Sequence, residues 1–286
     1  VMKKLSMLLA VTTLSFGLVA CNDTATPTPG TKTEQTSNLT LQDVFKKSME
    51  QSESIKSLSA NIDMTQLIEV PSQEISMETT SKMDMDMVIE PLSLYQKGTT
   101  SMTMPGMPSS EQADDMKMES YMTEQGFYMF DSMSNQWTKL PSDMYEQIMS
   151  MSQKQADPAK QLKDLEAFKD DFTFEQTDSS YVLKLAASGD KFNELIQKQL
   201  ADTMPDMMVE EQELLKEMNI EKVNYEIFID KETFNTTALN MIMDMTMVVE
   251  GEEMKLAQNL KSTYSKYNEV EKIVIPQEII DNAQEM

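Results

Sequence analysis

The chain has 286 residues, of which 40% are hydrophobic, so it can bury a sizeable core in one large domain or two small ones. Its formal charge is -24, and all 24 basic residues are lysines, with no histidine or arginine. These absences exclude serine–histidine triads, histidine-ligated zinc and arginine clamps on phosphate. Because a chain this acidic would repel the phosphates of DNA or RNA, we expect no nucleic-acid partner.

The first twenty residues have the pattern of an export signal. Lys3 and Lys4 precede an apolar run from Leu5 to Val19, which is too short and wrongly flanked to span a membrane. Leu-Val-Ala then precedes Cys21, the only cysteine, and this ending resembles the lipobox of bacterial lipoproteins. The resemblance implies that residues 1–20 are removed and that Cys21 carries a covalent diacylglycerol. The alternative is an ordinary secretory signal followed by a chance free thiol.

A lipidated Cys21 implies a protein that is anchored to a membrane. Residues 21–38 are rich in Thr, Pro, Asn and Ser and are without apolar periodicity, which is typical of a flexible tether. Residues 39–286 are then expected to form a single domain.

That domain is expected to open with a helix. Thr40 and Asp43 are spaced to cap it, and apolar residues recur at helical spacing to about residue 58. From Ser59 the period changes to two, which predicts strands through Met83–Ile89 and again from residue 116 to residue 130. Residues 98–115 are rich in turn formers, so we expect a long loop containing at most a short strand at residues 102–104.

The middle of the chain is predicted to be helical, and the end returns to strands. Helices are expected over residues 142–151, from Asp157 to about residue 168, and in two stripes between Phe192 and Met218. Strands are expected near residues 172–175, 181–186, 223–229, 241–249, 255–267 and 273–275. The predicted fold is α+β: a curved, mostly antiparallel sheet of about 8 to 11 strands, an open half-barrel with helices covering its concave face.

The chain contains 29 methionines, and many lie in Met-x-Met runs with strand periodicity. Alternation places such methionines on one face of a sheet. Three interpretations stay open: a packed core in which Met replaces Leu and Val, a cavity for a hydrophobic ligand, and a site for Cu(I), which thioethers favour. The candidate lining residues are Met83, Met85, Met87, Met116, Met118, Met241, Met243, Met245 and Met247.

No catalytic or metal site stands out beside the methionines. Asp84, Asp86 and Asp244 alternate with them, so we expect these carboxylates on the solvated face, and no calcium-loop pattern is present. Adjacent acids such as Asp114 and Asp115 are frequent in a chain with 48 acidic residues, so they do not indicate a general acid and base. We therefore expect a non-enzymatic protein without a cofactor other than its lipid.

Several later segments carry recognisable motifs, namely Tyr121–Tyr128, Trp137–Pro141, Tyr181–Leu183 with Ser188–Asp190, Asn224–Lys231, and Tyr264–Asn268 with Ile275–Pro276. These motifs resemble those of a family of Firmicutes surface lipoproteins of unknown function. The resemblance covers residues 40–286 and extends, more distantly, to the periplasmic lipoprotein-carrier and mycobacterial lipid-carrier lipoprotein fold. It implies a sheet wrapped around helices that holds acyl chains, although this chain lacks the arginine that some such carriers use.

The leading hypothesis is a carrier that binds a lipid or another hydrophobic ligand and is anchored through Cys21 on the extracellular face of the cell membrane of a Gram-positive bacterium. The alternative is an envelope interaction or sensing module with a packed core, whose acidic surface meets a cationic partner. A Cu(I)-binding protein is the third. The sequence predicts neither the ligand nor the oligomeric state.

Overall fold

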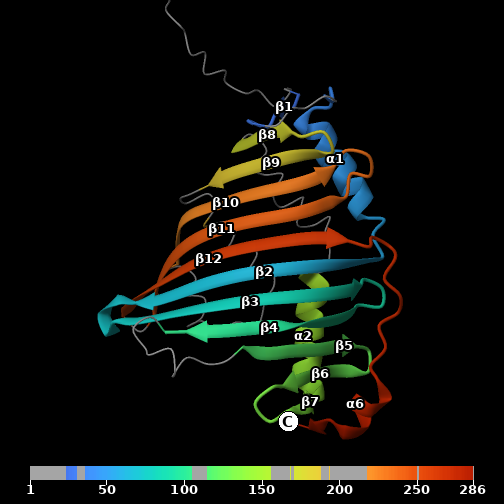
Figure 1. Cartoon of the computed structure of the whole chain (residues 1–286), viewed down its shortest axis with the longest axis vertical. Helices are drawn as coiled ribbons and strands as arrows, with labels where there is room; N and C mark the ends of the chain where they lie inside the picture. The colour runs from blue at the N-terminus through green and yellow to red at the C-terminus, as the bar shows by residue number, and fades with distance from the viewer. Residues whose placement is uncertain are drawn as a thin grey trace, which may run out of the picture.

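The fold is taken from a computed structural model, which describes residues 24–30, 36–104, 115–155, 168, 171–187, 193, 218–249 and 251–285. Thirteen strands form one sheet in the order β1-β8-β9-β10-β11-β12-β2-β3-β4-β5-β6-β7-β13 (Figure 1). Their bounds are β1 Thr26–Pro27, β2 Ser57–Val70, β3 Ile75–Val88, β4 Ser93–Thr103, β5 Met116–Thr123, β6 Gly126–Asp131, β7 Gln136–Lys139, β8 Phe172–Gln176, β9 Ser180–Ala187, β10 Asn219–Asp230, β11 Thr236–Val249, β12 Glu252–Ser265 and β13 Gln284–Glu285. The described helices are α1 Leu41–Ser52, the 3-10 turn η1 Pro71–Gln73, α2 Ser142–Gln155 and α6 Gln277–Asn282.

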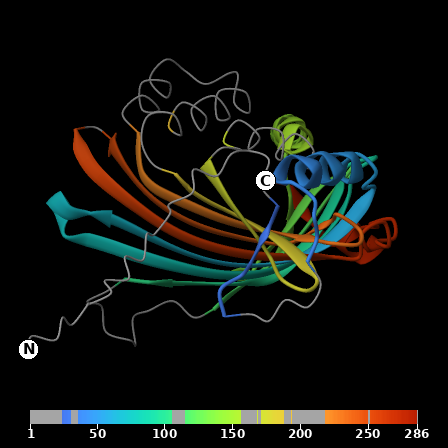
Figure 2. The ribbon, with the colours of Figure 1, turned by 90° about the horizontal axis from the view of Figure 1, so that it is seen from above.

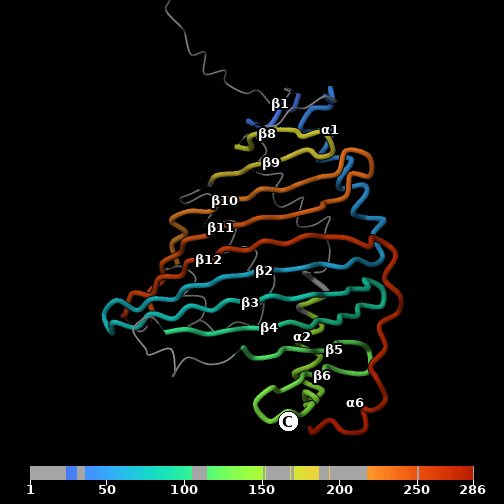
Figure 3. The backbone as a smooth tube through the Cα atoms, in the orientation of Figure 1, coloured from blue at the N-terminus to red at the C-terminus, as the bar shows by residue number. Residues whose placement is uncertain are grey.

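The sheet consists of two antiparallel meanders joined edge to edge. Strands β2 to β7 follow one another in space, as do β8 to β12, and β12 pairs with β2 in the middle. The sheet curves, and α1 and α2 both lie on its concave side (Figure 2). After β12 the chain passes the ends of the neighbouring strands before it reaches α6 (Figure 3).

The sheet is not closed, and its two edges are formed by the two shortest strands. β1 pairs with β8 and β13 pairs with β7, both in parallel, so the sheet is mixed. Such two-residue edge strands leave few unpaired backbone groups exposed to another chain. These two strands carry the count past the expected upper limit of eleven. The described part of the chain is also mostly β, whereas the class expected from the sequence is α+β.

The first helix of the domain, α1, begins with a capping box at Thr40. The Thr40 hydroxyl accepts a hydrogen bond from the Asp43 backbone N–H at 3.2 Å, and the Asp43 carboxylate accepts from the Thr40 N–H at 3.0 Å. This capping box confirms the predicted start of α1. The Asp43 carboxylate also accepts from the Thr40 hydroxyl at 2.7 Å, and this bond together with the one from the Thr40 N–H lowers the pKa of Asp43. Residues 24–30, assigned to the tether by sequence, instead dock on the sheet, with Ala25 in the core.

Two further expectations from sequence are wrong. Gly98 does not start a loop, since it lies inside β4, which continues to Thr103. A Cβ at this position would lie 2.0 Å from the carbonyl oxygen of Lys82, so the close approach of β3 requires a glycine here. Residues 273–275 form no strand, since Ile275 is instead buried against Tyr128 in the cluster beneath α6. The helices predicted around residues 157–168 and 192–218, and residues 105–114 of the predicted loop, lie almost entirely outside the described residues.

Candidate functional site

The strand register brings all nine candidate methionines to the concave face of the sheet. Met85 pairs with Ala60, and Met83 pairs with both Ile62 and Gly98. Gly98 in turn pairs with Met118, and the same parity places Met87 and Met116 on this face. On the other meander Met241 pairs with Leu260, which pairs with Met64 of β2. Met243, Met245 and Met247 follow along β11 with the same parity.

The concave face of the six central strands is almost free of charge. Every Asp, Glu and Lys of strands β2 to β5, β11 and β12 has the parity of the convex face, except Glu252 at the first position of β12. The uncharged polar side chains on the concave face include Gln66, Gln96 and Gln258, and Gln258 Nε2 donates to Met64 Sδ at 3.7 Å. A quarter of the chain is charged, so this separation of charge between the two faces is a strong feature of the sheet.

The methionines are less deeply buried than the core beside them. On β9 and β10, Leu183, Val223 and Ile227 are at most 2% exposed and pack beneath α1. Eight of the nine methionines are half-buried, and Met118 is 38% exposed.

Only some of the nine methionines join a hydrophobic cluster. Among the described residues, Met243 and Met245 pack against the α1 cluster, and Met85 and Met87 pack against the cluster of Ile55, Leu58 and Ala60. The five that belong to none of the three clusters are Met83, Met116, Met118, Met241 and Met247. Burial on the concave face therefore decreases from a closed core under α1 to a half-buried, methionine-rich surface across β11, β12 and β2 to β5.

Sequence reasoning found the methionines but missed the residues between them. Ile62 and Met64 of β2, and Leu256 and Leu260 of β12, complete the face and join its two halves. Their alternation was visible in the sequence, although the pairing of β12 with β2 was not. Asp84, Asp86 and Asp244 lie on the opposite face, as predicted.

The lipidation site that the sequence predicts has no structural description. Cys21 and the predicted export signal of residues 1–20 lie outside the described residues. Within residues 24–285, as far as they are described, no group of three or more His, Cys, Asp or Glu side chains could hold a metal ion. None of the helices in the described ranges is long and apolar enough to cross a membrane.

Comparisons with known proteins place the chain in a family. No curated protein matches it. One similar solved structure is a Brucella abortus protein described as beta-barrel-like, of the domain of unknown function DUF1849, with 10% identity, a TM-score of 0.21, and coverage of 74% of this chain and 100% of the other. Another is a DUF1329 family protein from Desulfovibrio piger, with 8% identity, a TM-score of 0.24, and coverage of 81% and 95%. Residues 40–284 match the family described as "Family of unknown function (DUF6612)", and the chain belongs to that family.

Proposed function

We propose that this protein is a non-enzymatic surface lipoprotein whose sheet forms an open half-barrel that binds a lipid or another hydrophobic ligand on its concave face. The observation that carries the proposal is the almost uncharged, half-buried concave face across β11, β12 and β2 to β5. Contact with an apolar ligand would remove more of this surface from water, which is the main source of affinity for such ligands.

Methionine suits this role better than leucine or valine would. Its unbranched side chain has three rotatable bonds and a polarizable sulfur, so a methionine surface adapts to ligands of varied shape. The few glutamines on the same face add hydrogen-bonding groups without charge, which could position a polar headgroup.

The proposed location follows from the sequence of the first 21 residues. A diacylglycerol on Cys21 would anchor the chain on the outer face of a Gram-positive cell membrane. An anchored binder of this kind would meet its ligand at or near the bilayer. The alternative of an envelope interaction module places the partner on the acidic surface instead and needs no ligand on the concave face.

Two neighbouring residues of β11 provide a matched test of the concave face. Met241 is half-buried on the concave side, and Ile242, the next residue, is 41% exposed and has the opposite parity. We expect Met241→Lys to abolish the fluorescence enhancement of N-phenyl-1-naphthylamine, and Ile242→Lys to retain it. Circular dichroism would show that both variants keep their sheet.

A third variant provides the same test of the concave face if Met241→Lys does not fold. Met118 is 38% exposed on the same concave face, so a lysine there places its charge on the face with less cost to folding. Met118→Lys should weaken probe binding while the thermal midpoint changes little. Probe binding that is equal in all three variants, or absent from the wild-type protein, would contradict the proposal.

A further inference from the structure

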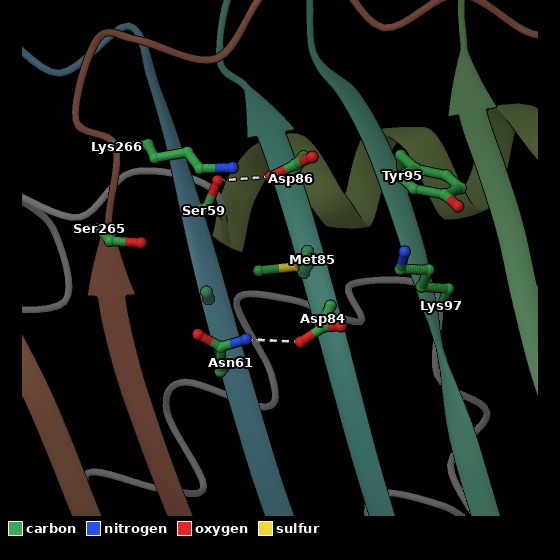
Figure 4. Close-up of a pocket in the computed structure, with 10 residues that line it drawn as sticks. Ser59, Asn61, Asp84, Met85, Asp86, Tyr95, Lys97, Ser265 and Lys266 are labelled. Carbon is green, nitrogen blue, oxygen red and sulfur yellow. Dashed lines mark hydrogen bonds between the residues drawn. The ribbon is translucent and has the colours of Figure 1, made fainter.

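A polar pocket lies on the convex face, where β2, β3 and β4 meet the end of β12. Its volume is about 300 Å³, at the lower end of the range for small-molecule sites. Figure 4 shows its polar side chains in front of the strands, with a helix passing behind them. The polar groups of the pocket and the methionine-rich face therefore lie on opposite sides of one sheet, so the two surfaces can bind independently of each other.

Two carboxylates form the centre of this pocket. Asp84 and Asp86 alternate along β3, and their side chains share the convex face. The Asn61 side-chain amide donates to Asp84 Oδ1, and the Ser59 hydroxyl donates to Asp86 Oδ1 (Figure 4). The described residues supply no donor to either Oδ2 atom, so each carboxylate keeps an oxygen that can accept a hydrogen bond from a ligand.

Two ammonium groups flank these carboxylates. Lys97 pairs with Asp84 across the β3–β4 ladder, and Lys266 directly follows β12 with a left-handed φ of 51°. Within the described part of the chain neither ammonium forms an ion pair. Each can therefore donate to a ligand, and their two positive charges balance the two carboxylates, so the pocket as a whole is neutral.

Tyr95 adds an aromatic ring with a fixed position. Its hydroxyl donates to Glu119 Oε1 at 3.0 Å, and its ring centroid lies 4.6 Å from that of Tyr121. Burial and the bond to Glu119 raise the pKa of Tyr95, so this hydroxyl stays protonated and occupied. What Tyr95 offers to the pocket is therefore its ring and not a free polar group.

From these groups we infer a binding site for a neutral saccharide on the convex face. Each sugar hydroxyl can both accept from an ammonium and donate to a carboxylate, which is the alternation that Lys97 and Asp84 present. The C–H face of a pyranose ring is apolar and fits against an aromatic ring such as Tyr95. An uncharged saccharide also matches the neutral pocket, whereas the chain's net charge of -24 would repel an acidic one.

The test is a titration of the purified full chain with cellobiose, maltose and N,N′-diacetylchitobiose, followed by backbone amide NMR. We expect at least one disaccharide to shift the amides of β2, β3 and β4 around the pocket, with saturation in the millimolar range. Asp86→Asn should weaken this binding by about tenfold, because it removes a charged acceptor while the amide oxygen can still accept from Ser59.

Matched variants separate recognition from folding. Asp63→Asn changes a carboxylate on the same face of β2 outside the pocket and should bind as the wild type does. Tyr95→Phe keeps the ring and should retain binding, whereas Tyr95→Leu should lose it. No amide shift with any of the three disaccharides, or wild-type binding by Asp86→Asn, would overturn the inference. Binding of the zwitterionic dipeptide alanyl-alanine in place of the sugars would also overturn it.

Discussion

Truncation of Ile227 and of Met83 to alanine should cost very different free energies of unfolding, although both side chains lie on the concave face. Ile227 is 2% exposed within the cluster beneath α1, so Ile227→Ala should cost about 2–5 kcal/mol through lost burial and a cavity. Met83 is half-buried, pairs with Gly98, which has no side chain, and lies outside the described clusters. Met83→Ala should therefore cost only about 1 kcal/mol.

Urea unfolding followed by circular dichroism would measure this difference. If both variants keep the same dependence of the unfolding free energy on urea concentration, the shift of each unfolding midpoint measures the lost stability. Ile227→Ala should unfold at the lower urea concentration. Met118→Ala serves as a third point: its side chain is 38% exposed, so its cost should be the smallest. If Met83→Ala cost as much as Ile227→Ala, the methionines would be a packed core and the reasoning for a ligand surface would be refuted.

Three other predictions test particular contacts. Gly98→Ala should lower stability by about 1–3 kcal/mol or more in thermal melts, because its Cβ would meet the Lys82 carbonyl oxygen at 2.0 Å, and a neutral effect would contradict the β3–β4 register. Thr40→Ala should cost about 1 kcal/mol and raise the pKa of Asp43 toward its ordinary value, which an unchanged NMR titration would disprove. Hydrogen bonds from the Ser72 and Gln73 side chains of the β2–β3 turn lower the pKa of Glu252 below its ordinary value of 4.5. These bonds therefore stabilise the turn fully above pH 4.5, and their contribution is lost as the pH falls through the lower pKa of the folded state. The protection of that turn against hydrogen exchange, relative to the intrinsic exchange rate at each pH, should fall in this acidic window in the wild type, whereas Glu252→Gln should show no such pH dependence.

The sequence predicted the long strands well because their periodicity is local. Met83, Met85 and Met87 alternate with charged neighbours, so one face of β3 could be assigned before its partners were known. The capping box at Thr40 is also local, since it lies within four residues. Both features depend on chemistry that a short window contains.

Features that depend on distant partners could not be predicted in this way. Thr26 pairs with Glu175 of β8, so its place in the sheet is invisible to any short window of a segment rich in Thr and Pro. Gly98 suggested a turn by composition, yet the approach of Lys82 on a neighbouring strand is what requires it. The convex pocket has the same origin, because Lys266 and Asp86 come to line one pocket only through the pairing of β12 with β2.

The most direct test of the central claim is the native mass spectrum of the purified protein beside its denatured spectrum. We predict an excess mass of a lipid-like molecule in the native spectrum, lost on denaturation and reduced by Met241→Lys but not by Ile242→Lys. A bare protein mass that stays unchanged after incubation with lipid vesicles would contradict a ligand on the concave face. That result would favour a packed methionine core and a protein partner on the acidic surface.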